Sequence, residues 1–141
     1  MKKWGPISYL CIVFHGFIGC NSPKQPAEIA PTQKPAQITW KSISKDLGKI
    51  PMGDTALIFF PFTNSGDSPL FITSVDGGCS CLQAKGPDHP ILPRQTDSIR
   101  VAFYTQLSVT GWVRKSIQVS ANTIPNTHRL LFSAEITGHK K

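Results

Sequence analysis

Apolar residues recur at every other position along much of the chain from residue 38 onward. The clearest case is the segment 57–62, in which Ile58, Phe60 and Phe62 fall on one face of an extended chain. Successive side chains of a strand point to opposite faces. The alternation therefore predicts a half-buried β-strand that places three large side chains in the core.

The other face of this predicted strand is also partly apolar, because it carries Leu57, Phe59 and Pro61. Proline cannot donate a hydrogen bond to a neighbouring strand, so Pro61 predicts a free edge or a bulge nearby. If Leu57 and Phe59 point away from the core, they form an apolar patch beside such an edge. We regard these two residues as candidate partner-binding residues.

Segments rich in glycine, proline, asparagine and aspartate separate the alternating segments. The first, 64–69, reads Asn-Ser-Gly-Asp-Ser-Pro and predicts either a hairpin or a corner between two sheets. Further strands are predicted at 38–44, 70–75, 98–105, 112–120 and 129–137, with turns or loops at 46–54, 83–93, 106–111 and 121–126. No segment keeps a helical period. We expect an all-β fold, an immunoglobulin-like β-sandwich in a single domain.

The first 20 residues have the pattern of an export signal. Lys2 and Lys3 precede an apolar run, 7–18, that is shorter than the roughly 20 residues needed to span a bilayer. The run ends in Phe17-Ile18-Gly19-Cys20, which resembles the lipobox of bacterial lipoproteins, with Phe17 in place of the usual leucine. This resemblance implies that Cys20 is lipidated and becomes the first residue of the mature protein.

A proline-rich segment separates Cys20 from the predicted sandwich. Residues 21–37 contain four prolines among mostly polar residues and have no apolar period. In an extended polyproline-like conformation this segment would reach on the order of 50 Å. The predicted parts are a lipoprotein signal peptide (1–19), a lipidated tether (20–37), the β-sandwich (38–138) and a basic tail (139–141). The protein is therefore expected in the cell envelope, lipid-anchored to a bacterial membrane and facing the periplasm or the surface.

The positive charge of the chain is concentrated at its ends. The formal net charge is +7 at pH 7. Four lysines lie in the leader and the tail, whereas residues 38–138 hold nine Lys or Arg and seven Asp or Glu, a net charge of only +2. A phosphate backbone requires a concentrated positive face, so we do not expect nucleic acid as a partner.

Two closely spaced cysteines, Cys79 and Cys81, follow the flexible dipeptide Gly77-Gly78. Three interpretations stay open. In the first, which we favour, the pair is a local disulfide or two quiet thiols that shape the loop, because an exported protein meets an oxidising environment. In the second, so small a ring is strained and easily reduced, which would make it a redox centre. In the third, two thiolates and His89 hold a soft metal such as Cu(I) or Zn²⁺.

No other motif indicates catalysis. The chain lacks a Gly-x-Ser-x-Gly elbow, a His-Glu-x-x-His pair and a phosphate-binding loop. Most of its aspartates stand beside turn residues, where aspartate caps backbone N–H groups. We expect no catalytic residues and no cofactor. The expected function is a membrane-anchored binding or scaffolding module that contacts another envelope protein; the alternative is a thiol redox or soft-metal module acting through Cys79 and Cys81.

The order of these motifs resembles the bacterial family called domain of unknown function 1573. Its members show Phe-x-Phe-x-Asn-x-Gly, then Pro-Leu-x-Ile, then Cys-x-Cys. The matching residues here are Phe60, Phe62, Asn64, Gly66, Pro69, Leu70, Ile72, Cys79 and Cys81. Further on, Pro90, Ile91 and Pro93 match a Pro-Ile-x-Pro-Gly segment, with Arg94 in place of the glycine. The resemblance spans about 48–138. It implies an immunoglobulin-like fold that is common in lipoproteins, and it implies no activity.

Overall fold

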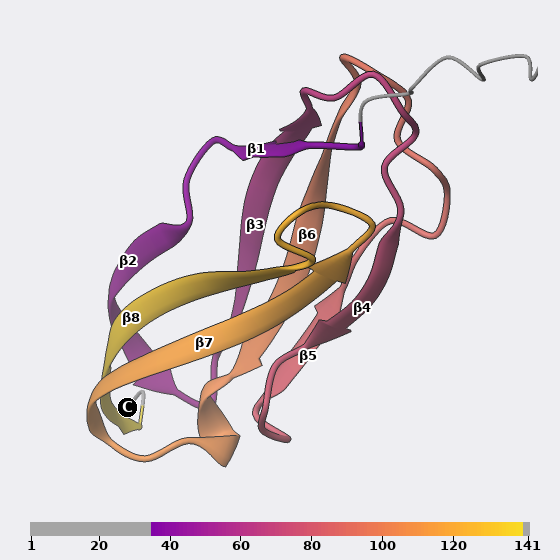
Figure 1. Ribbon diagram of the computed structural model, residues 1–141. Helices are drawn as coiled ribbons and strands as arrows, with labels where there is room; N and C mark the ends of the chain where they lie inside the picture. Colours follow the sequence, from indigo (N-terminus) through magenta and orange to yellow (C-terminus); the bar gives the residue numbers. More distant parts are fainter. Residues whose placement is uncertain (1–34, 140–141) are drawn as a thin grey trace, which may run out of the picture. The chain divides into compact units, whose positions relative to one another are not determined.

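Two four-stranded β-sheets pack face to face in this protein (Figure 1). The structure is a computed structural model that describes residues 35–139, so the predicted signal peptide, Cys20 and nearly all of the predicted tether lie outside the described residues. Apart from the short 3₁₀ turn η1 (Thr105–Leu107), the described residues contain no helix, and none therefore that is long and apolar enough to cross a membrane. The predicted all-β, immunoglobulin-like sandwich is confirmed.

The first sheet has the order β1-β3-β6-β5, and all its neighbouring strands are antiparallel. Its strands are β1 (Ile38–Trp40), β3 (Thr55–Asn64), β6 (Thr96–Tyr104) and β5 (Leu82–Lys85). The second sheet has the order β2-β8-β7-β4, in which β2 and β8 run parallel and the other pairs antiparallel. Its strands are β2 (Ser44–Met52), β8 (Thr127–His139), β7 (Gly111–Ala121) and β4 (Ile72–Asp76).

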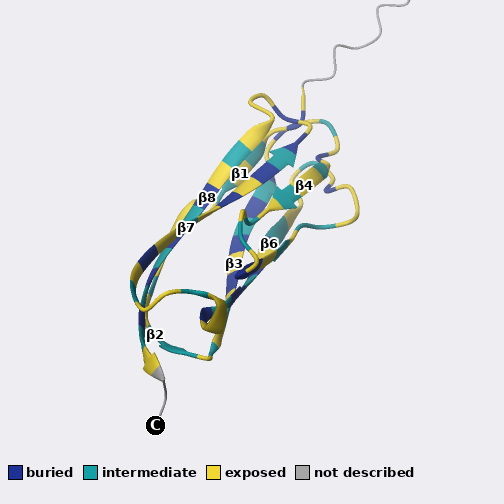
Figure 2. Cartoon of the chain, turned by 90° about the horizontal axis from the view of Figure 1, so that it is seen from below, coloured by how far each residue is buried: buried dark blue, intermediate teal, exposed yellow. Residues whose placement is uncertain are grey.

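The core lies between the two sheets. Buried and exposed residues alternate along the strands (Figure 2). Ile58, Phe60 and Phe62 of β3 are each at most 2% exposed, as their alternation predicted. Phe103 of β6 and Phe132 of β8 are in contact across the core, with ring centroids 5.2 Å apart. Burial of these apolar side chains is the main favourable contribution to folding.

The segment 64–69 is a corner between the sheets, not a hairpin, because β3 and β4 belong to different sheets. Asn64 organises this corner from a fully buried position. Its side-chain amide donates to the backbone oxygens of Ser68 and Ile91 at 2.8 and 2.9 Å, and its side-chain oxygen accepts from the N–H of Gly66 at 3.0 Å. A buried amide with its hydrogen bonds satisfied fixes the path of two loop segments at once, the corner itself and the loop that contains Ile91.

Pro61 was predicted to have a free edge or a bulge nearby, and it lies where the pairing of β3 with β1 ends. Strand β1 ends at Trp40, opposite Phe62, and Lys41 then donates its backbone N–H to the Pro61 oxygen at 3.0 Å. In an antiparallel pair the N–H and C=O of one residue point to the same neighbour. The hydrogen that proline lacks would therefore face Lys41, so the only bond that Pro61 cannot make is the reciprocal one to Lys41, just past the end of β1.

Two predicted loops were partly wrong. The segment 46–54 was predicted as a turn with short extended pieces, but most of it belongs to the nine-residue strand β2. Gly48 has φ +64° and its N–H bonds the Asp46 carboxylate at 3.1 Å, which makes a bulge in the pairing with β8. The bulge breaks the apolar alternation without ending the strand.

The other wrong boundary concerns the loop predicted at 83–93. Its first residues belong to β5, which pairs with β6 at the edge of the first sheet. This strand has only four residues, and although they alternate between apolar and polar, so short a run does not stand out from the loop residues around it. A third boundary also moved, because the strand predicted at 38–44 divides into β1 in one sheet and the start of β2 in the other.

Candidate functional site

The outer face of the first sheet carries the most exposed apolar side chains of β3. Leu57 is 70% exposed and Phe59 is 47% exposed. They alternate with the buried Ile58 and Phe60, so the strand's own period turns them away from the core. The structure thus places both candidate partner-binding residues on the surface and on the same face.

Two rows of side chains cross this face. In the first row Leu57 of β3 lies opposite Ala102 of β6, and Ala102 lies opposite Gln83 of β5. The second row is displaced along the strands by two residues. It holds Phe59, Arg100 and Lys85 in the same order.

A shallow groove of about 500 Å³ runs over these rows. Its lining combines the apolar side chains of β3, Ala102 and Arg100 on β6, and Gln83 and Lys85 on β5. Ala102 is small and stands between the larger Leu57 and Gln83, so the face is hollowed at this position of β6. The groove therefore has an apolar wall on β3 and a polar wall on β5.

One end of the groove is polar. Lys85, Ser98 and Arg100 also line a smaller pocket of about 100 Å³, together with Asp88, His89 and Asp97. His89 lies between the two aspartates, with Nδ1 3.4 Å from Asp88 Oδ1 and Nε2 3.3 Å from Asp97 Oδ2. The two depressions are adjacent, because they share these three lining residues.

Of the two basic side chains at this end of the groove, one has an acidic neighbour and the other has none. The pKa of the Asp88 carboxyl is held below its usual value, first by its hydrogen bond with His89, then by a backbone hydrogen bond and by the nearby charge of Lys85. Lys85 thus has an acidic neighbour. The exposed Arg100 guanidinium, by contrast, forms no hydrogen bond or ion pair with any residue of the range 35–139.

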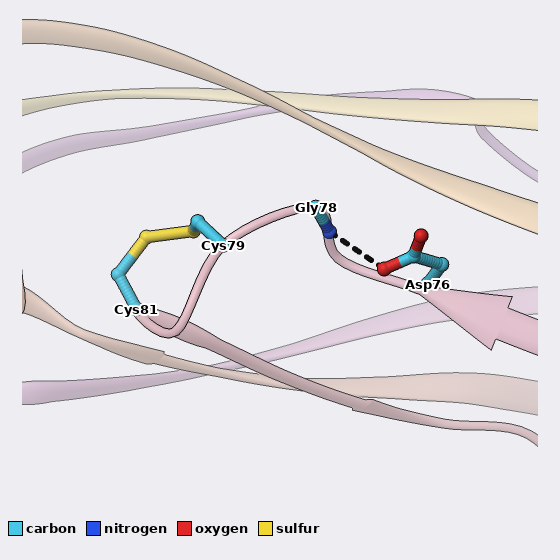
Figure 3. Close-up of a disulfide and its surroundings, with 4 residues drawn as sticks. All are labelled: Asp76, Gly78, Cys79 and Cys81. Atoms are coloured by element: carbon cyan, nitrogen blue, oxygen red, sulfur yellow. Dashed lines mark hydrogen bonds between the residues drawn. A yellow bond between two sulfur atoms is a disulfide. The ribbon is translucent and has the colours of Figure 1, made fainter.

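Cys79 and Cys81 form a disulfide in the loop before β5 (Figure 3). The loop is tightly folded: the Asp76 carboxylate accepts the Gly78 N–H at 2.8 Å, and the Leu82 N–H donates to the Cys79 oxygen at 3.1 Å. Cys81 is only 2% exposed. The pair therefore belongs to the support of β5.

The disulfide loop is linked to the groove through Tyr104 of β6. The Tyr104 N–H donates to the Cys81 oxygen at 2.9 Å, and its hydroxyl donates to the Gln83 side-chain oxygen at 2.8 Å. These two bonds fix the start of β5 beside β6. They also hold Gln83 in its place on the polar wall of the groove.

The structure does not bring His89 together with the two cysteines. His89 contacts Asp88 and Asp97 instead, and no three His, Cys, Asp or Glu side chains of the described part of the chain form a group that could hold a metal ion. The sulfurs are bonded to each other, whereas a soft-metal site requires free thiolates. The soft-metal alternative therefore gains no support from this arrangement.

Sequence reasoning identified the apolar wall of the groove but missed its polar wall. Within the strand predicted at 98–105, Arg100, Ala102 and Tyr104 are two residues apart and therefore share one face. Nothing in the sequence indicated that Gln83 and Lys85 lie beside them, because that depends on the pairing of β5 with β6.

Comparisons with known proteins agree with this fold. A family model described as "Protein of unknown function (DUF1573)" matches residues 38–136. A Porphyromonas gingivalis W83 protein of unknown function has a TM-score of 0.63 and 22% identity, over 79% of this chain and 51% of that one. The chain thus spans about half the length of that protein. No curated protein sequence matches the chain.

Two further solved structures share the fold at lower identity. The PapD-like domain 7 of human CEP192 has a TM-score of 0.53 and 11% identity, over 96% of this chain and 100% of that one. The Vibrio cholerae protease VesB has a TM-score of 0.54 and 14% identity, over 71% of this chain and 31% of that one. Likenesses at such low identity concern the fold alone.

Proposed function

The chain belongs to the DUF1573 family, as its motifs predicted, and from that premise we propose that it is a non-catalytic protein-binding module of the cell envelope that binds its partner through the groove on the first sheet. The family has no known function, so the proposal depends on the site. The observation that carries it is the exposure of Leu57 and Phe59 on the wall of a groove of about 500 Å³.

The exposed apolar side chains of the groove support its role as a binding site for a partner. Large apolar side chains that gather on one exposed face mark interaction surfaces, because leaving them in water is unfavourable. Concave apolar sites with a few placed polar groups are typical binding sites. Here Gln83, Lys85 and Arg100 supply the polar groups beside Leu57 and Phe59.

The membrane anchor is part of the proposal. Lipidated Cys20 would hold the module at a membrane, and the proline-rich segment would separate the sandwich from the lipid surface. An intact mass of the protein extracted from its native membrane tests this. A mass that corresponds to cleavage before Cys20 plus acyl chains is expected, and a mature mass without acyl chains would remove the anchor from the proposal.

Site-specific photo-crosslinking in the native envelope tests the binding site. A photoreactive residue at Leu57 should yield a defined adduct with another envelope protein. The matched control is Trp112, which is 69% exposed at the start of β7 on the other sheet. Equal adducts from Leu57 and Trp112, or none from Leu57, would contradict the proposed site.

A further inference from the structure

The two walls of the groove differ in chemistry and stand one extended chain apart. Neighbouring strands are about 4.8 Å apart, so the β3 wall and the β5 wall, which β6 separates, stand about 10 Å apart. That width accommodates one extended peptide lying along β6. Leu57 and Phe59 form one wall, Gln83 and Lys85 form the other, and Arg100 rises from the floor.

An extended peptide in this position would present its side chains to the walls in turn. Successive residues of an extended chain point to opposite sides, and residues two apart are separated by nearly 7 Å. Leu57 and Phe59 are also two residues apart on one face of β3, so the peptide and the apolar wall have the same repeat. Every second side chain of the peptide would meet the apolar wall, and those between would meet the opposite wall, where Lys85 and Arg100 share one row and Gln83 lies in the other.

The unpaired Arg100 guanidinium indicates which peptide side chains fit opposite the apolar wall. Arg100 has no anionic partner among residues 35–139, and an arginine donates two parallel hydrogen bonds to a carboxylate. On the basis of the proposed protein-binding function, we infer that the groove binds an extended segment of a partner protein in which apolar and acidic residues alternate. The apolar residues pack on Leu57 and Phe59, and the acidic residues pair with Arg100 and Lys85.

Two other ways of covering the face fit less well. A partner strand added to the edge of β5 would lie three strand spacings, about 14 Å, from β3 and would leave Leu57 and Phe59 uncovered. A second copy of this chain would bring a further Arg100 and Lys85 to a face that has no unpaired carboxylate to offer them. An acidic, alternating segment satisfies both walls.

Calorimetric titration of the full-length mature protein in detergent tests the inference. The probe is a blocked ten-residue peptide of alternating valine and glutamate. Two control peptides are used, one with lysine in place of glutamate and one with the same valines and glutamates in two separate blocks. The alternating valine–glutamate peptide should bind, and Arg100→Gln should weaken its binding about tenfold, because a hydrogen bond to a charged group is lost.

A matched variant separates this contact from overall charge. Arg114 is an exposed arginine on the other sheet, so Arg114→Gln removes the same charge and should leave binding unchanged. Arg100→Lys should retain part of the affinity. Equal binding of either control peptide, no binding of the alternating peptide, or no effect of Arg100→Gln would overturn the inference.

The outcomes also separate this inference from the proposed function. An envelope adduct from Leu57 together with no binding of the alternating peptide would refute the peptide chemistry and leave the binding site standing. Absence of both would refute the two together. A dimer that Leu57→Ser dissociates, measured by sedimentation, would identify a second copy as the occupant and overturn the inference.

Discussion

Arg94 occupies a backbone conformation that suits glycine. Its φ is +70°, and its N–H donates to the Asn64 oxygen at 2.8 Å in the loop before β6. The family resemblance implies glycine at this position, and a residue with a Cβ is disfavoured there by about 1–2 kcal/mol. Arg94→Gly should therefore stabilise the protein by about 0.5–1 kcal/mol, after the entropy cost of glycine is subtracted. Urea unfolding measures the change. Arg94→Ala keeps the Cβ and should give no gain; equal gains in both variants would contradict the explanation.

His128 makes stability depend on pH. Burial lowers the pKa of its imidazole below the usual value of 6.5. The Thr123 hydroxyl gives its single proton to the Pro125 oxygen, so His128 Nε2, 2.8 Å away, donates to Thr123. With a lowered pKa the folded state binds fewer protons than the unfolded state, so the stabilisation is complete above about pH 6.5 and is lost as the pH falls through the folded-state pKa.

Melting temperatures at pH 7.5 and 5.0 check this contribution of His128. The wild-type protein should melt at a lower temperature at pH 5.0, and His128→Gln should reduce that difference. The control is His89→Gln, because the His89 side chain is exposed. If His128→Gln keeps the full wild-type difference, another group is responsible.

At the scale of elements, the disulfide loop and β5 act as one unit. The Cys79–Cys81 bond closes a small ring beside β5, and Tyr104 links that ring to Gln83 in the groove. Replacing both cysteines by serine should cost about 1–2 kcal/mol, the loop-closure entropy of so short a ring. It should also weaken partner crosslinking from Leu57 only partly. If the double variant stays folded but gives no partner crosslinking at all, the result would support the thiol alternative instead.

A comparison of the strands shows how much of the fold could be predicted from the sequence. The faces of β3 followed from one alternating segment, because each residue type there suits one environment. Strand β2 was not predicted in full because its bulge at Gly48 interrupts the apolar alternation. Strand β5 was not predicted because it has only four residues. The corner residue Asn64 was identified only as a turn former, since its burial depends on Ser68 and Ile91 arriving from elsewhere. For the same reason the polar wall of the groove could not be predicted: strand pairing brings it into place.

At the scale of the whole molecule, stability and binding are assigned to opposite faces of the same sheet. The core lies between the sheets, joined by contacts such as Phe103 with Phe132, and the groove lies on the outside. A face that contributes little to folding is free to carry apolar residues for a partner. Adjacent residues of β3 should therefore differ sharply in what they control.

Leu57 and Ile58 provide the comparison, because they are neighbours with 70% and 2% exposure. Ile58→Ala removes packing from the core and should cost about 2–5 kcal/mol. Leu57→Ala should change stability by about 0.5 kcal/mol or less yet weaken partner crosslinking, measured from a photoreactive residue at Phe59. Chemical unfolding and crosslinking of both variants, under conditions where Ile58→Ala stays folded, give the result. Partner crosslinking that falls with stability in both variants alike would show that the outer face of β3 serves the fold and not a partner.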